Sequence, residues 1–302
     1  MMTFDTPAHA ACPARRPPLS IGARPAVFVL LTAVLTAARP SIAADDSAAI
    51  YVMRPDGSQV RQVAKVVGFL HATSPRWSHD GKRAAFDAWS VERKNRAVFV
   101  VNIDGTGLRE LPGNARPDWS PDDKQLAFDR YSNGPSRVHV QNLDGEGDAQ
   151  IAEGVCARWS PDGSQMAVTN HSMIYVIDLV SGEEKPLFNS PSRELFGGFN
   201  WSPDGKWIAL SARREFQKPR QLLLVSTQGA DHGLRVRFQS EQGGSITFSP
   251  DGKRIAFDNG YKIFIAEVDS TTEPQMVEPQ EGKNQDPHWS PDGQWILFSS
   301  DR

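Results

Sequence analysis

The segment Pro287–Arg302, PHWSPDGQWILFSSDR, contains the motif that decides the fold. In it, an aromatic residue and a serine directly precede a Pro-Asp-Gly turn, and a short apolar run follows the turn. Five related strings occur upstream: RWSHDGKRAAFDA (76–88), DWSPDDKQLAFDR (118–130), RWSPDGSQMAVTN (158–170), NWSPDGKWIALSA (200–212) and TFSPDGKRIAFDN (247–259). The chain therefore contains six copies of one hairpin motif.

The six copies recur at a nearly constant spacing. The aromatic residue of the motif stands at Trp77, Trp119, Trp159, Trp201, Phe248 and Trp289, so successive copies lie 40 to 47 residues apart. Self-similarity at this period is typical of propeller blades and of helical arrays. Within each copy, apolar and polar residues alternate between turn sequences, and this period of two indicates β-strands. The sequence therefore predicts a β-propeller, with the six aromatic residues in the core between blades.

The unit that begins at Arg116 predicts four strands per blade. It reads RPDWS-PDD-KQLAFDR-YSNGPS-RVHVQNL-DGEG-DAQIAE, in which short strand-like runs are separated by turn residues. In the Ser-Pro-Asp-Gly turn, proline presets φ, aspartate bonds its own backbone and glycine takes a positive φ. We therefore interpret the repeated aspartates as turn residues. His79 in place of proline and Asp123 in place of glycine depart from the motif.

A second hairpin motif predicts how the propeller closes. It also occurs six times, and its first copy, IYVMRPDG (50–57), has no aromatic-serine hairpin before it. The last aromatic-serine hairpin, at Trp289, has no second hairpin after it, so the two ends together complete one repeat. We predict an all-β fold: a six-bladed β-propeller of four-stranded antiparallel blades, closed by pairing of N- and C-terminal strands in one blade. Closure in this way removes exposed strand edges.

The beginning of the chain differs from the repeats. Three arginines precede an apolar run, Ala26–Ala38, and small residues follow it. This order is typical of a signal peptide, and the run is shorter than the roughly 20 residues that span a bilayer. We expect residues 1–43 to be a signal peptide and residues 46–302 to be a single propeller domain. The mature protein is then periplasmic or secreted, with no membrane span.

Removal of the first 43 residues changes the charge and the cysteine content. That segment contains four arginines and one aspartate, so the mature chain carries 29 basic and 35 acidic residues, a net charge near −6. Nucleic-acid binding needs clustered positive charge, so we expect no nucleic-acid partner. Cys156 is then the only cysteine, which excludes an internal disulfide. We interpret it as a small core or channel-side residue.

The W-S-P-D-G-K-x-I-A-F hairpin followed by I-Y-V-M-x-x-D-G resembles the repeat of the TolB-like (TolB/WD40-like) six-bladed propellers. The resemblance covers about residues 46 to 302. It implies a periplasmic protein-binding role in the Tol–Pal cell-envelope system, with a Pal-like lipoprotein as partner of the propeller. TolB also has an α/β domain ahead of its propeller, where it contacts TolA, and we expect this chain to lack that domain.

Candidate binding residues lie on the innermost strand of each blade, just before the aromatic residue. Period-two alternation places the residues one and three positions before the aromatic on the face opposite to it. Polar side chains at these positions either form a solvated channel wall or bind a partner or ligand. The proposed partner- or ligand-binding ring is Arg76, Arg116, Asp118, Arg158, Asn200, Asp286 and His288.

Motifs for catalysis are not found in the sequence. It contains no HExxH, paired-cysteine or GxSxG pattern, so we expect no catalytic residues, no metal site and no cofactor. We therefore expect a monomeric protein-binding scaffold, not an enzyme. The alternatives are a carbohydrate-acting lyase or hydrolase, and a small-ligand or metal-binding sensor. A stoichiometric divalent ion at Asp286 and His288 would favour the sensor.

Overall fold

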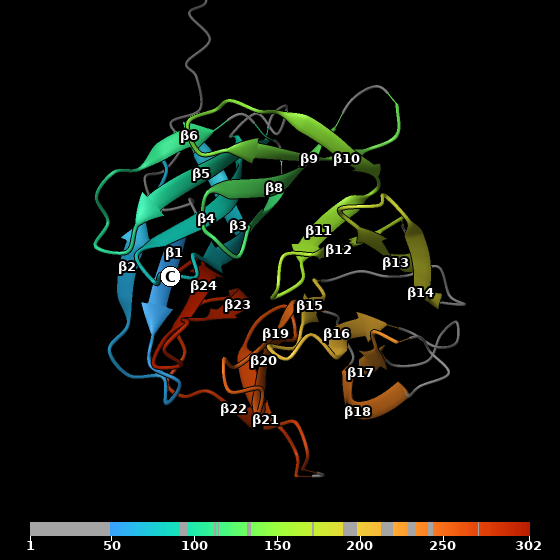
Figure 1. Ribbon diagram of the computed structural model, residues 1–302. Coiled ribbons are helices and arrows are strands. Elements are labelled where there is room, and N and C mark those ends of the chain that lie inside the picture. Colours follow the sequence, from blue (N-terminus) through green and yellow to red (C-terminus); the bar gives the residue numbers. More distant parts are fainter. Residues whose placement is uncertain are drawn as a thin grey trace, which may run out of the picture. The chain divides into compact units, whose positions relative to one another are not determined.

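The computed structural model describes residues 49–90, 96–111, 113, 115–131, 134–170, 172–189, 198–212, 220–228, 234–240, 244–270 and 272–302. Ala43–Arg302 form one compact unit, and the predicted signal peptide lies outside the described residues. The described strands form six four-stranded sheets, which Figure 1 shows arranged around a common axis. The described residues include no helix long and apolar enough to cross a membrane.

Each sheet is one blade, and five of the six are meanders of consecutive strands. Blade 2 consists of β3 (Phe69–Trp77), β4 (Arg83–Ser90), β5 (Arg96–Asn102) and β6 (Arg109–Leu111). Blade 3 consists of β7 (Ala115–Trp119), β8 (Gln125–Arg130), β9 (Arg137–Asn142) and β10 (Ala149–Glu153). Blade 4 consists of β11 (Val155–Trp159), β12 (Gln165–Thr169), β13 (Met173–Asp178) and β14 (Glu184–Asn189). Blade 5 consists of β15 (Asn200–Trp201), β16 (Trp207–Ala212), β17 (Arg220–Ser226) and β18 (Leu234–Ser240). Blade 6 consists of β19 (Ile246–Phe248), β20 (Arg254–Asp258), β21 (Ile263–Glu267) and β22 (Gln275–Met276).

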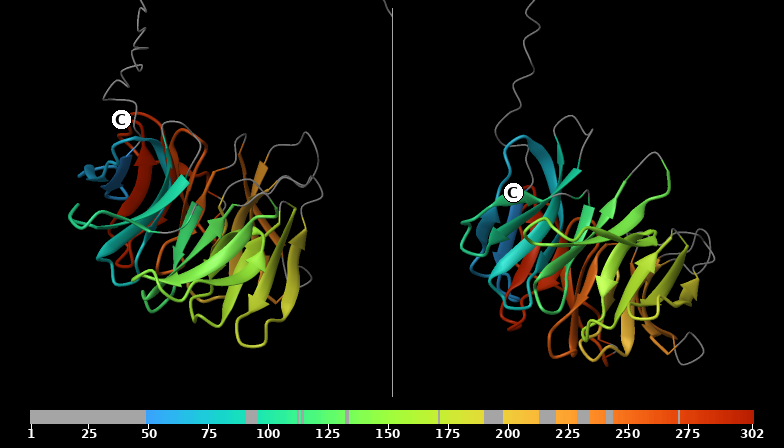
Figure 2. Two further views of the ribbon diagram at one scale, coloured as in Figure 1. Left: turned by 90° about the horizontal axis from the view of Figure 1, so that it is seen from above. Right: turned by 45° about the horizontal axis from the view of Figure 1, so that its top comes forward.

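Blade 1 joins the two ends of the described chain. Its strands follow the order β2 (Arg61–Ala64), β1 (Ala49–Met53), β24 (Ile296–Ser300) and β23 (Asn284–Trp289). The β1 and β24 strands pair antiparallel from Ala49 opposite Ser300 to Met53 opposite Ile296, and the views in Figures 1 and 2 both place these blue and red strands side by side. The predicted fold and its closure are confirmed.

The innermost strand of every blade carries the aromatic-serine motif. Each of these strands, β3, β7, β11, β15, β19 and β23, contacts the next one around the ring, and β23 contacts β3. Apolar clusters fill the space between neighbouring blades: one joins Ala127 and Val138 of blade 3 to Val168 and Tyr175 of blade 4. The alternating apolar residues of the repeat therefore form a core that is continuous from blade to blade.

The repeated Ser-Pro-Asp-Gly segments form turns, as predicted. In each, the serine Oγ donates to Oδ1 of the turn aspartate, for example 2.6 Å from Ser160 to Asp162. Asp162 Oδ1 also accepts the Ser164 amide at 3.0 Å. These donors favour the charged form, and they lower the pKa of Asp162. The turn aspartates are therefore bound within their own turns.

The innermost strands depart from simple alternation at one point. Four residues three positions before the aromatic have positive φ: Ser74 (52°), Arg116 (52°), Cys156 (58°) and Asp286 (54°). In each case the innermost strand has one residue more than the strand that it pairs with. In blade 2, for example, Thr73 pairs with Asp87 and Arg76 pairs with Ala85. These β-bulges re-aim the side chains, so the prediction that both sets share one strand face is wrong at these positions.

A carboxylate of the preceding blade binds each bulge. In three blades the backbone N–H of the bulge residue donates to an aspartate: Arg116 to Asp87 Oδ1 at 3.0 Å, Cys156 to Asp129 Oδ1 at 2.8 Å, and Asp286 to Asp258 Oδ2 at 3.1 Å. The Ser74 amide donates to Asp286 Oδ2 at 3.0 Å. Asp87, Asp129 and Asp258 are buried and Asp286 is partly buried, so each bond helps to fix the orientation of one blade against the next.

Candidate functional site

A pocket of about 280 Å³ lies where the innermost strands of all six blades meet. Every blade contributes the motif aromatic: Trp77, Trp119, Trp159, Trp201, Phe248 and Trp289, here called the aromatic layer. Turn residues Pro161, Pro203, Pro250, Pro291 and His79 also line it. The pocket therefore combines aromatic and proline rings with about as much polar surface.

The aromatic layer belongs to both the core and the pocket. Trp119 is 1% exposed and Trp201 5% exposed, and their indole Nε1 atoms donate to the carbonyls of Arg76 at 3.1 Å and Arg158 at 3.0 Å. These bonds join each tryptophan to the preceding blade. The repeat pattern predicted that the aromatic residues lie in the core between blades; in the structure the same layer also lines the pocket.

The residues directly before the aromatics form a polar layer beneath the aromatic layer: Arg76, Asp118, Arg158, Asn200, Thr247 and His288. Four of its members line the pocket floor: Asp118, Asn200, Thr247 and His288. Asn200 Nδ2 donates to Thr247 Oγ1 at 3.3 Å. The structure therefore brings three of the predicted site residues, Asp118, Asn200 and His288, to one surface.

The two arginines of the polar layer are sealed below the floor. Arg76 and Arg158 are each 1% exposed, and Arg76 Nε lies 3.6 Å from Asp118 Oδ1. A Cβ added to Gly198, just before β15, would be 3.6 Å from Arg76 Nη2. Since β3 and β15 are three blades apart, Arg76 reaches across the axis. Burial and the nearby Arg158 lower the pKa of Arg76 to about 10.

His288 is a hydrogen-bond acceptor within the polar layer. Its Nδ1 accepts the Trp77 amide at 3.2 Å, so the ring proton is on Nε2. Burial, together with Arg76 and Arg158, lowers the pKa of His288 well below its usual range. The imidazole is therefore neutral at pH 7.

The other two predicted site residues form contacts away from the pocket: the Arg116 side chain within blade 3, and Asp286 between blades. Arg116 Nη1 donates to Asp129 Oδ2 and to Tyr131 Oη, both at 2.8 Å. Asp286 accepts the Ser74 amide at 3.0 Å, and its other oxygen accepts the Ser245 hydroxyl. Neither residue lines the pocket. Their positions in bulges account for this difference from the sequence prediction.

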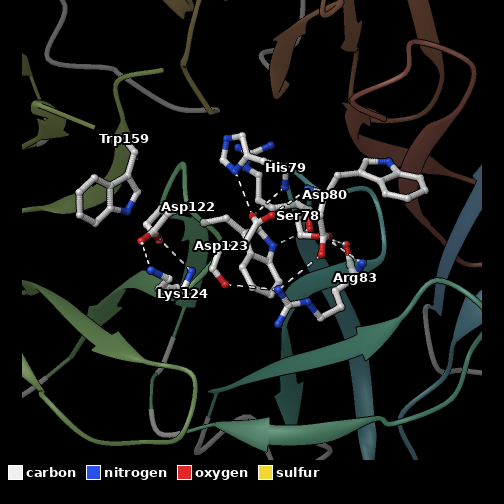
Figure 3. A network of polar contacts seen from close by, with 12 residues as sticks. Ser78, His79, Asp80, Arg83, Asp122, Asp123, Lys124 and Trp159 are labelled. Atoms are coloured by element: carbon white, nitrogen blue, oxygen red, sulfur yellow. Dashed lines mark hydrogen bonds and ion pairs between the residues drawn. The ribbon is translucent and has the colours of Figure 1, made fainter. Parts of the chain in front are cut away.

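The two departures from the turn motif form a matched pair in neighbouring blades (Figure 3). The Asp123 carboxylate accepts the amides of His79 and Asp80, both at 2.7 Å, and its Oδ1 lies 3.1 Å from His79 Nδ1. Proline in place of His79 would supply no N–H, and glycine in place of Asp123 no acceptor. The motif departures were visible in the sequence, whereas their contact across 44 residues was not.

Other turns use a different contact at the same place. A Cβ added to Gly205 or Gly293 would lie 3.9 Å or 3.3 Å from Pro161 or Pro250 of the preceding blade. Both glycines have φ near +70°, which favours glycine over residues with side chains. The rim of the pocket is therefore made of stacked turns, with one polar junction between blades 2 and 3.

Comparisons with known proteins agree with this architecture. Residues 114–257 match the family model of the TolB beta propeller domain. The structure of a protein assigned as TolB from Agrobacterium tumefaciens superposes with a TM-score of 0.68 at 20% identity, covering 84% of this chain and 98% of that one. TolB from Acinetobacter baumannii gives 0.57 at 22% identity, covering 85% of this chain and 64% of that one.

A curated relative matches a smaller part of the chain. An uncharacterized protein of Agrobacterium fabrum is 37% identical over 105 residues, and the match spans 34% of its length and 33% of this chain. In the central blades, the sequence repeat, the blade topology and the family model all indicate the same propeller fold. The structural likeness to the two TolB structures covers 84% and 85% of this chain. The chain is a six-bladed β-propeller whose residues 114–257 match the TolB beta propeller domain.

Proposed function

We propose that this propeller is a periplasmic protein-binding scaffold, acting as a monomer, that docks an envelope protein such as a Pal-like lipoprotein at its axial pocket. The observation that carries the proposal is the pocket itself, to which every blade contributes an aromatic side chain. Large aromatic side chains supply much of the binding energy at protein interfaces. The likeness to TolB structures supports a role in cell-envelope organisation or transport.

A non-catalytic role is part of this proposal. Within the described residues, no group of three or more His, Cys, Asp or Glu side chains is placed to hold a metal ion. His288 Nδ1 accepts a hydrogen bond from a backbone N–H. His139, on β9, has its Nδ1 2.7 Å from Oδ1 of Asp148, which directly precedes β10. These contacts favour structural roles for both histidines and give the lyase and sensor alternatives no support.

Titration with the purified soluble domain of the host's Pal-like lipoprotein tests the docking proposal. Five tryptophans line the pocket, so we expect docking to change the intrinsic tryptophan fluorescence in a saturable way. Pro203→Glu at the pocket rim should weaken binding at least tenfold, because it places a charge beside the apolar wall. Fluorescence and calorimetry should give the same dissociation constant.

Pro121→Glu is the matched control, because Pro121 occupies the same turn position in blade 3 but does not line the pocket. It should bind like the unmodified protein. Equal weakening by Pro203→Glu and Pro121→Glu would assign the effect to turn stability, and the pocket would then not be the docking site. Absence of any interaction with the lipoprotein would contradict the proposed partner.

A further inference from the structure

The pocket floor covers a buried positive charge that its neighbours balance only in part. Arg76 has Asp118 at 3.6 Å, but Arg158 forms no ion pair among the residues that the structure describes. Both side chains are 1% exposed, and Arg158 contributes to lowering the pKa of Arg76. Buried charges in proteins are normally paired, so Arg158 lacks the partner that its environment requires.

The same region has more buried hydrogen-bond donors than acceptors within the described chain. Arg76 Nε and Nη1, Arg158 Nε, and the indole Nε1 atoms of Trp77, Trp159 and Trp289 are buried donors without an acceptor in the described chain. Among the described residues, the Arg158 guanidinium donates one hydrogen bond, from Nη1 to the Ala157 carbonyl at 2.7 Å. Unpaired buried donors destabilise a protein. The aromatic and polar layers together therefore have an excess of donors.

Nearby carboxylates are already bonded elsewhere. Asp118 Oδ2 accepts the Trp159 amide at 2.9 Å, and both Asp286 oxygens accept hydrogen bonds from Ser74 and Ser245. His288 is neutral and holds its proton on Nε2, so on the floor it is a further donor. Asp129, whose charge also acts on Arg158, is bonded to Arg116 Nη1 and to the Cys156 amide. The acidic groups of the described chain therefore balance Arg158 only from a distance.

We propose that the pocket floor is a carboxylate-binding site, in which Arg158, assisted by Arg76, balances the charge of the bound group. The guanidinium fork matches the geometry of a carboxylate, which it can bind through two parallel N–H bonds. Rotation of the Arg158 side chain toward the floor breaks the bond to Ala157, its one hydrogen bond within the described part of the chain. A carboxylate of a small molecule and that of a glutamate side chain present the same chemistry, and this inference does not depend on a protein partner.

Two probes test the site on the intact mature protein: sodium succinate and a glutamate-containing tetrapeptide with blocked termini. Each is titrated at constant ionic strength against sodium chloride, with tryptophan fluorescence and Tm as readouts. We expect saturable binding and a rise in Tm with at least one probe. Arg158→Gln should weaken this binding at least tenfold. Arg137→Gln should not change it, because Arg137 lies on β9 outside the pocket although its Nε is also buried without an acceptor.

The outcomes distinguish the sources of the carboxylate. Binding of both probes indicates a free carboxylate ligand, and binding of the peptide alone indicates a side chain of a docked protein; both support the site. Effects no larger than those of chloride, or equal binding by Arg158→Gln and the unmodified protein, would overturn it. If Arg158→Gln does not fold, Arg158→Lys keeps the charge without the fork, and its binding should be weaker; unchanged affinity would also overturn the proposal.

Discussion

The contact between His79 and Asp123 permits a double-mutant cycle across the junction of blades 2 and 3. Asp123→Gly removes a carboxylate that accepts two backbone amides at 2.7 Å and lies 3.1 Å from the imidazole. It also relieves a non-glycine residue at φ 58°. His79→Pro removes one of the amides and the imidazole. The double substitution restores the proline–glycine pairing that the other turns use.

The expected magnitudes follow from these contacts. A hydrogen bond to a charged group contributes about 1.5–3 kcal/mol when buried, and less at this exposed junction, where water replaces part of it. We expect Asp123→Gly to lower the free energy of unfolding by about 1–2 kcal/mol after the gain from the relaxed backbone. His79→Pro should lower it by about 1 kcal/mol and the double substitution by close to zero, so the coupling between the two sites is about 2–3 kcal/mol.

Urea denaturation followed by tryptophan fluorescence measures all four free energies. Asp123→Asn is a useful further variant, since it keeps the left-handed residue but removes the charge. Additive effects of His79→Pro and Asp123→Gly, with the double variant as unstable as their sum, would refute the matched-pair explanation. The reciprocal change, Pro161→His with Gly205→Asp, should be tolerated better as a pair than singly, because it recreates the same contact.

Three further predictions concern the interblade contacts, the channel and the closure. Asp129→Asn should destabilise the protein by about 2 kcal/mol in thermal or urea unfolding, because it removes the charge of a buried carboxylate that accepts hydrogen bonds from the Arg116 guanidinium and the Cys156 amide. The lowered pKa of His288 means that its stabilising contribution is present above the unfolded-state pKa and is lost as pH falls below it. The unmodified protein should therefore lose up to about 1.4 kcal/mol per pH unit there, and His288→Gln less, in urea unfolding at pH 7.5 and 5.5. Deleting Pro287–Arg302 removes β24, the partner of β1, and should abolish cooperative unfolding in calorimetry; a soluble, cooperatively folding monomer would contradict the closure.

The candidate site was only partly predictable from the residues around the aromatic. Asp118, Asn200 and His288 were expected at a channel surface and line the pocket. Arg116 and Asp286 were expected there too, but a bulge adds one residue to each of their strands. The Arg116 side chain then bonds Asp129 within blade 3, and Asp286 bonds Ser74 and Ser245 of the neighbouring blades. A strict period of two cannot anticipate a bulge, because the extra residue is fixed by a carboxylate from another blade.

The sequence by itself determined the six blades, the turns and the joining of both ends in blade 1. These features depend on local periodicity, turn chemistry and the count of motif copies, all of which are present along the chain. Only the tertiary structure decided which side chains share a surface, as with His79 and Asp123, and which charges are buried, as with Arg158. The reason is physical: burial and pairing depend on how the blades stack around the axis, and residues about 40 positions apart meet only when that stacking is complete.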